Sequence, residues 1–214
     1  MLQIVPASFR YACLGALVLA ALVFIGWGLV TRRHAIPCPA WLAWLLERPF
    51  GEDRRARIAI QQLHLESGMR VLDAGCGPGR LTIPIAREVS PNGSVTALDI
   101  QEGMLQKARA RAHAAGLTNI RFVRAGLERA ALEPDYFDRA LMVTVLGEIP
   151  DREAALRDLF GALKRGGLLS VTEILVDPHY QRRETILRIA RKVGFLEGQF
   201  FGNRLSFTLN LVKP

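Results

Sequence analysis

Cysteine is scarce in this 214-residue sequence, which contains three: Cys13, Cys38 and Cys76. Their spacing matches neither a disulfide framework nor a set of metal ligands, so we expect no disulfide and no metal site. Internal repeats and low-complexity segments are also lacking. The length is that of one domain of ordinary size with an appendage.

Acidic residues are outnumbered, with 20 Asp and Glu against 28 Lys and Arg and a formal net charge of +8. A basic balance suits nucleic acid, an anionic membrane surface or simple solubility. The next feature of the chain favours the membrane surface. We therefore expect the lipid bilayer as a partner and no nucleic acid.

That feature is a charge-free apolar stretch of 19 residues, 12–30. As a helix it would be about 28 Å long, which matches the hydrocarbon core of a bilayer. A cleaved signal peptide is the alternative, but it would have a shorter apolar region and a small-x-small cleavage site. This stretch instead runs into Thr31-Arg32-Arg33. We predict an uncleaved transmembrane anchor at 12–30.

Residues 31–50 are predicted to be an interfacial linker with a short helix. This segment contains Trp41 and Trp44 between two prolines, Pro39 and Pro49. Tryptophan prefers the membrane–water interface because its ring is apolar and its N–H is polar. Alternatively, the two rings cover the core of the following domain.

From residue 51 to residue 214 the pattern predicts one α/β domain. Strands are expected at 69–73, 94–99, 119–124, 137–145, 167–176, 195–201 and 205–212, and helices at 79–89, 102–115, 151–164 and 178–193. Strands that alternate with helices predict a mostly parallel sheet between helix layers, and the last two strands predict an antiparallel hairpin. Pro84 is expected to bend or delay the first of these helices.

A glycine-rich turn follows the first strand of this domain. Residues 71–79 read Val-Leu-Asp-Ala-Gly-Cys-Gly-Pro-Gly, with Asp73 at the tip of the strand. Glycine lets the backbone approach a ligand closely or adopt φ > 0. The second strand ends in Asp99, twenty residues past Gly79, where an acid can accept hydrogen bonds from both ribose hydroxyls of a nucleoside. The two features predict a nucleoside cofactor.

The pattern G-x-G-x-G, with an acid two residues before its first glycine, resembles motif I of class I S-adenosylmethionine-dependent methyltransferases. Asp99 matches the acidic position of motif II, and the resemblance covers about residues 68–213. It implies a Rossmann-like, seven-stranded sheet, S-adenosylmethionine as cofactor and methyl transfer without a metal. Asp73, Gly75, Gly77 and Gly79 would line the methionine moiety, and Asp99 would hold the ribose. The alternative is a glycine-rich turn in an α/β domain that binds no cofactor.

The same resemblance places Ile100 and Met104 near the adenine. Members of the family often have an acid after the third strand that accepts a hydrogen bond from the adenine amino group. This sequence has Gly126 at that place. Glu128 or a backbone carbonyl would have to substitute for the acid.

Three residues are candidates for binding or deprotonating the methyl acceptor. Glu148 follows the fourth strand, where the acceptor should enter, and either pairs with a cationic amine, acts as a base or is a solvated loop acid. Glu173 lies inside an apolar strand, so its carboxylate must be paired or face a cavity. His179 is a base candidate near neutral pH or an exposed loop histidine. Arg182 and the arginines after it form a solvated helix face or contact phosphate or lipid headgroups.

The resemblance implies methylation without naming the acceptor. Members of the family include quinone C-methyltransferases and phospholipid N-methyltransferases, and an anchored domain suits an acceptor dissolved in the bilayer. We therefore expect a single-pass membrane methyltransferase of a lipid or lipophilic small molecule. Its domain should face the cytoplasm, where S-adenosylmethionine is made. The alternatives are a tethered methyltransferase of a soluble small molecule or protein, and a non-catalytic cofactor-binding scaffold.

Overall fold

The computed structural model describes residues 58–214 together with Tyr11, Gly15, Val18, Leu19 and Gly26. The predicted anchor at 12–30, apart from these single positions, and the predicted linker at 31–50 lie outside the described residues. Among the helices of the described part, none combines the length and the apolar character needed to cross a bilayer.

The sheet has seven strands in the order β3-β2-β1-β4-β5-β7-β6. They are β1 (Arg70–Ala74), β2 (Ser94–Asp99), β3 (Ile120–Arg124), β4 (Phe137–Val143), β5 (Leu163–Ile174), β6 (Leu196–Gly202) and β7 (Ser206–Val212). The first five are parallel, whereas β7 runs antiparallel to both of its neighbours. The predicted Rossmann-like sheet with a C-terminal antiparallel hairpin is confirmed.

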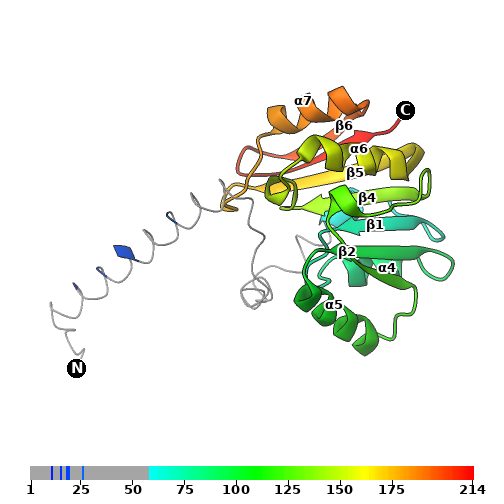
Figure 1. Cartoon of the computed structure of the whole chain (residues 1–214). Helices are drawn as coiled ribbons and strands as arrows, with labels where there is room; N and C mark the ends of the chain where they lie inside the picture. Colours follow the sequence, from blue (N-terminus) through cyan, green and yellow to red (C-terminus); the bar gives the residue numbers. More distant parts are fainter. Residues whose placement is uncertain (1–10, 12–14, 16–17, 20–25, 27–57) are drawn as a thin grey trace.

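Helices cover both faces of this sheet. They are α4 (Thr82–Glu88), α5 (Glu102–Ala114), α6 (Arg152–Ala162) and α7 (Arg183–Val193). Val71 packs with Ile85 of α4, whereas its neighbour Leu72 packs with Leu156 of α6. Because adjacent strand residues point to opposite faces, α4 and α6 lie on opposite sides of the sheet. Figure 1 shows α6 beside β5, α7 beside β6, and α4 and α5 beside β2.

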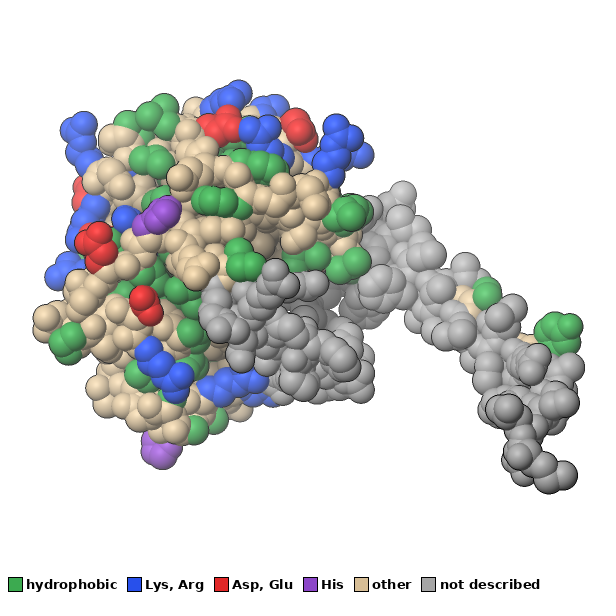
Figure 2. Space-filling model, turned by 180° about the vertical axis from the view of Figure 1, so that it is seen from behind, with side chains coloured by type: hydrophobic (Ala, Val, Ile, Leu, Met, Phe, Trp, Pro, Cys, Tyr) green, Lys and Arg blue, Asp and Glu red, His purple; other side chains and the backbone are tan. Residues whose placement is uncertain are grey.

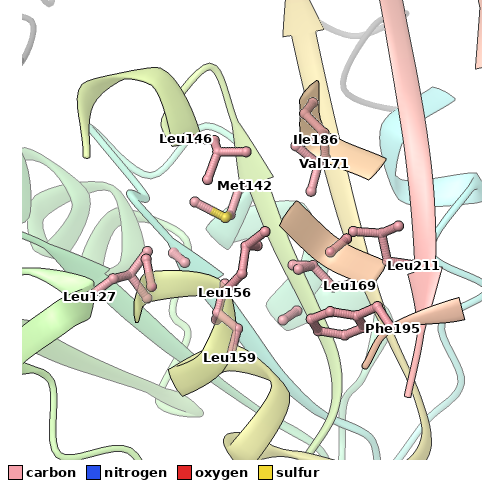
Figure 3. Close-up of a cluster of buried hydrophobic side chains, with 14 of the residues drawn as sticks. Leu127, Met142, Leu146, Leu156, Leu159, Leu169, Val171, Ile186, Phe195 and Leu211 are labelled. Carbon is pink, nitrogen blue, oxygen red and sulfur yellow. The ribbon is translucent and has the colours of Figure 1, made fainter. Parts of the chain in front are cut away.

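The larger part of the core lies between the sheet and the pair α6 and α7. In Figure 3, Leu156 and Leu159 of α6 point toward Leu169 of β5, and Ile186 of α7 lies beside Val171. All five side chains are fully buried. This packing holds the carboxyl ends of β4 and β5 in place, and the candidate site lies at those ends.

Three predicted helix boundaries differ from the structure by two residues or more. The helix predicted from residue 79 begins at Thr82, with Pro84 in its first turn, where the missing N–H of proline costs no hydrogen bond. The helix predicted to residue 164 ends at Ala162, because β5 already begins at Leu163. The helix predicted from residue 178 begins at Arg183, because a hydrogen-bonded loop precedes it.

Candidate active site

The glycine turn after β1 lies at the carboxyl edge of the parallel strands. Gly75, Gly77 and Gly79 all have positive φ, at 80°, 51° and 83°, a conformation that side chains with a Cβ rarely adopt. A Cβ on Gly75 would collide with Val145, and one on Gly79 would lie 3.0 Å from the Cβ of Ala108. A Cβ on Gly77 would meet no protein atom within 4 Å. Gly77 therefore faces open space, as a position that a ligand approaches should.

Asp99 is joined to this turn by hydrogen bonds. Its Oδ2 accepts from the backbone N–H of Gly77 at 2.9 Å, and its Oδ1 accepts from the N–H of Gln101 at 2.8 Å. Burial raises the pKa of Asp99, and these backbone donors counteract the rise. Each carboxylate oxygen can accept a second hydrogen bond, so the side chain can still receive two ribose hydroxyls.

Asp73 is buried at the end of β1 and accepts a hydrogen bond from the hydroxyl of Thr82 at 2.6 Å. Burial raises the pKa of Asp73 to about 6; the Thr82 hydroxyl lowers it and the negative charge of Asp99 raises it further. Two carboxyl groups that disfavour each other's charge make a site that a cation would stabilise. The ammonium and sulfonium of S-adenosylmethionine are such cations.

Of the two apolar residues predicted to lie near the adenine, one is exposed and one is buried. Ile100, which follows Asp99, is 51% exposed, whereas Met104 of α5 is buried. An apolar side chain exposed beside the ribose acid is available to pack on a base. Gly126 is half-buried directly before a short 3₁₀ helix, Leu127–Arg129. The side chain of Glu128 lies outside the described part, so its predicted role stays a prediction.

A cavity of about 410 Å³ lies beside the ends of β4 and β5. Its lining residues are Gly147, Arg152, Leu175, His179, Tyr180, Gln181 and Arg182. The guanidinium of Arg152 donates to the backbone carbonyls of Leu146 and Gly147. The loop that contains Gly147 also contains Val145, which packs against Gly75 of the glycine turn. One short loop thus separates the cofactor turn from this cavity.

Glu173 lies directly behind the cavity wall. It is 1% exposed, and its Oε2 accepts from the backbone N–H of Gln181 at 3.0 Å. Its Oε1 is buried with no hydrogen-bond partner. Burial raises the pKa of Glu173 to about 8, with Asp177 and Glu148 raising it and the Gln181 N–H and Arg152 lowering it. A carboxyl group in this state is mostly neutral near pH 7; the neutral form can donate a proton, and only the ionised form, which predominates above about pH 8, can accept one.

The structure brings the other two catalytic candidates to the same place. Glu148 ends a short 3₁₀ helix, Leu146–Glu148, and is close enough to raise the pKa of Glu173. His179 lines the cavity and is buried, so the alternative of an exposed loop histidine is wrong. The carbonyl of His179 contacts the backbone of Gly147, where a Cβ would not fit.

The sequence did not predict three further residues of this region, which are Arg152, Gln181 and Thr144. Arg152 and Gln181 line the cavity, yet neither belongs to a pattern that marks a site. Thr144, directly after β4, has φ of 54°. This is rare for a β-branched residue and is typical of backbone held under strain at functional sites. Arg182, predicted to belong to a solvated helix face, also lines the cavity.

A parallel α/β sheet with this glycine turn and these two strand-end carboxylates defines a class I S-adenosylmethionine-dependent methyltransferase. The sequence model of the methyltransferase domain family matches residues 65–194. The chain belongs to this family, and its cofactor is S-adenosylmethionine.

Curated relatives and solved structures agree with this assignment. The chain is 38% identical over 118 residues to a protein of Vibrio vulnificus named ubiquinone/menaquinone biosynthesis C-methyltransferase UbiE, which covers 55% of the chain and 45% of the relative. The chain spans about half the length of the curated relatives it matches. A SAM-dependent methyltransferase from Aquifex aeolicus shares the fold, with a TM-score of 0.76 at 19% identity over 83% of this chain and 100% of that one. Phosphoethanolamine N-methyltransferase 2 of Haemonchus contortus, in complex with S-adenosyl-L-methionine, also shares the fold. The TM-score is 0.66 at 17% identity, over 75% of this chain and 52% of that one.

The residues present fit the cofactor. Gly77 leaves space at the turn, Asp99 keeps free acceptor positions, and Asp73 supplies a buried carboxyl group that a cation would ionise. The individual contacts predicted for Ile100, Met104 and Gly126 stay predictions.

Proposed function

We propose that this protein is a membrane-anchored methyltransferase that transfers the methyl group of S-adenosylmethionine to a lipophilic quinol, at a ring carbon. The observation that carries the proposal is the cavity beside β5, which is one loop away from the glycine turn and has a buried, unpaired carboxyl oxygen behind its wall. Similarity to quinone C-methyltransferases supports the choice of acceptor.

The cavity suits the polar head of such an acceptor. Leu175 and the Tyr180 ring supply apolar surface, while Arg152 and Gln181 supply donors that can orient hydroxyl or carbonyl oxygens. Bound S-adenosylmethionine supplies an electrophilic methyl group. The main task of the protein is then to hold the reacting carbon in line with that group.

Proton handling is the second task. Ring methylation of a quinol replaces a ring proton by the methyl group, so one proton must leave the acceptor. His179 lines the cavity and is the group placed to take it up, directly or through a hydroxyl of the acceptor. Glu173, with its pKa raised to about 8, can take up a proton only in its ionised form. The bond between sulfur and the methyl group breaks, so the sulfonium leaves as a neutral thioether. The positive charge that it carried leaves as the ring proton.

The membrane part of the proposal depends on the sequence. The charge-free stretch 12–30 would place the domain at the bilayer that dissolves the acceptor, with the domain on the cytoplasmic side. Membranes that contain the full chain should retain it after carbonate and high-salt washing, because apolar insertion is not screened by salt. Release by either wash, or an N-terminus processed near residue 33, would contradict the anchor.

The acceptor is tested by incubating such membranes with methyl-labelled S-adenosylmethionine and a total lipid extract. Label in the quinone fraction supports the proposal, and the Asp99→Ala variant serves as the inactive control. Label in phospholipid would instead favour N-methylation of a headgroup. Label confined to water-soluble compounds or to protein would favour the tethered alternatives, and no transfer at all would favour a non-catalytic scaffold.

A further inference from the structure

A small apolar patch lies at the carboxyl edge of the sheet and borders the cavity. It consists of Leu175, Val176 and Leu205, which are 45%, 77% and 62% exposed. Leu175 and Val176 form the turn after β5, and Leu205 lies in the connection between β6 and β7. Exposed leucine and valine side chains that gather at loop tips mark a surface that contacts another apolar phase.

The two loops of the patch are joined to each other. The N–H of Leu175 donates to the carbonyl of Leu205 at 2.8 Å, and the hydroxyl of Tyr180 donates to the carbonyl of Arg204 at 2.9 Å. Since Leu175 and Tyr180 also line the cavity, the patch borders the entrance to the proposed acceptor site. These hydrogen bonds hold the two loops against each other beside that entrance.

Positive charge surrounds the patch. Arg182 and Arg204 are exposed. Burial raises the pKa of Tyr180, Glu173 and Glu184 raise it further, and both arginines lie near enough to oppose the rise. Of the other cations between Leu175 and Leu205, Arg183 and Arg191 pair with Glu197, and Lys192 pairs with Glu153, so the positive charge around the patch rests on Arg182 and Arg204. In Figure 2 hydrophobic side chains gather at the right-hand end of the domain, with Lys and Arg side chains above them.

We propose that this patch, Leu175, Val176 and Leu205 with Arg182 and Arg204 around it, inserts into the surface of an anionic bilayer and opens the acceptor cavity toward the lipid. Apolar tips enter the headgroup region while arginines pair with lipid phosphates, the combination that holds proteins at membrane interfaces. The charge complementarity selects an anionic lipid surface over a neutral protein surface. The proposal rests on the lipophilic acceptor proposed above.

The test places an environment-sensitive fluorophore on the patch of the full chain. Cys13 and Cys38 are replaced by serine, and Cys76 is kept because it is buried. Val176→Cys and Leu205→Cys introduce the label, and Glu133→Cys, exposed in the loop before β4 at the opposite edge of the sheet, is the matched control. Vesicles of phosphatidylcholine and phosphatidylglycerol contain lipids with a quencher on the acyl chain.

We expect severalfold stronger quenching at positions 176 and 205 than at position 133. Arg204→Gln should reduce this quenching in vesicles that contain phosphatidylglycerol and leave it unchanged in pure phosphatidylcholine. Equal quenching at all three positions would overturn the proposal. So would a label whose emission changes with protein concentration in the absence of vesicles, since that result would show contact with a second copy of the chain.

A turnover measurement separates this proposal from the proposed function. The double variant Val176→Ser and Leu205→Ser should lose severalfold activity on a vesicle-borne quinol and keep its activity on a short-chain, water-soluble one. Quenching without methylation of any quinol would support the docking surface and contradict the acceptor. If quinol is methylated and the double variant is as active as the parent on both acceptors, the acceptor is supported and the docking surface is overturned.

Discussion

The carboxylate of Asp99 accepts a hydrogen bond from the backbone N–H of Gly77, 22 residues away in sequence, at 2.9 Å. This bond joins the acid that ends β2 to the glycine turn that follows β1. Gly75 and Cys76 add two backbone hydrogen bonds from the same turn to the carbonyl of Leu98, at 2.7 and 2.9 Å. The two motifs of the cofactor site are thus joined into one hydrogen-bonded unit.

Asp99→Ala should weaken S-adenosylmethionine binding by about 2–4 kcal/mol, because it removes two charge-assisted hydrogen bonds to the ribose. It also leaves the N–H groups of Gly77 and Gln101 without their acceptor. Calorimetric titration of the full chain in detergent micelles measures the change. Glu133→Gln, at an exposed position far from the site, is the control. Equal affinity of the Asp99 variant and the parent would contradict the assignment of the ribose site.

Gly77→Ala should reduce cofactor affinity at least tenfold with only a small loss of stability. Its φ is 51°, so alanine costs about 1 kcal/mol of backbone strain, but no protein atom meets the added Cβ. Gly116, at the end of α5, is a matched control because its φ is 66° and it also faces open space. Both variants should unfold at similar denaturant concentrations. If both also bind the cofactor like the parent, the space at Gly77 is not the ligand site.

Much of this site could be predicted from the sequence because its parts are local. The turn after β1 and the acid after β2 each follow an apolar strand, and parallel strands bring their carboxyl ends together. Glu173 was also predictable, since a lone carboxylate in an apolar strand requires a cavity or a partner. The cavity itself was not, because Arg152 and Gln181 meet there only through tertiary packing. The late start of α7 has the same cause, since Gln181 uses its N–H on Glu173 before the helix begins.

Cofactor binding should strengthen as the pH rises through about 6. The pKa of Asp73 is raised to about 6, and only its ionised form attracts the ammonium and sulfonium groups. Affinity should therefore fall about tenfold between pH 7 and pH 5 if binding requires that form. Thr82→Val removes a hydrogen bond that lowers this pKa, so its midpoint should move to higher pH.

Calorimetry across this pH range measures both midpoints. Asp73→Asn is the control, because an amide does not titrate and the step near pH 6 should disappear. Persistence of that step in Asp73→Asn would assign it to another group, such as Asp99, whose pKa burial also raises.

Glu173→Gln should stabilise the fold near pH 8 and leave it nearly unchanged near pH 4.5. The pKa of Glu173 is about 8 in the folded protein, against 4.5 for an unperturbed glutamate. Below pH 4.5 both the folded and the unfolded states hold the proton. Between pH 4.5 and 8 the unfolded state loses it while the folded state keeps it, so the native protein loses stability as the pH rises, by at most about 5 kcal/mol in total. The glutamine variant lacks this loss.

Denaturant unfolding of both proteins in detergent micelles, followed across this pH range, measures the difference in stability. If the stability of the two proteins changes with pH in the same way, Glu173 is not held neutral in the folded state.

The same variant should lower kcat on the quinol acceptor and leave cofactor affinity unchanged, because the carboxyl group lies behind the cavity that Gln181 lines and away from the glycine turn. Since the variant is expected to be at least as stable as the parent, a loss of kcat cannot be attributed to unfolding. An unchanged kcat would remove Glu173 from proton handling and leave His179 and Glu148 as the remaining candidates.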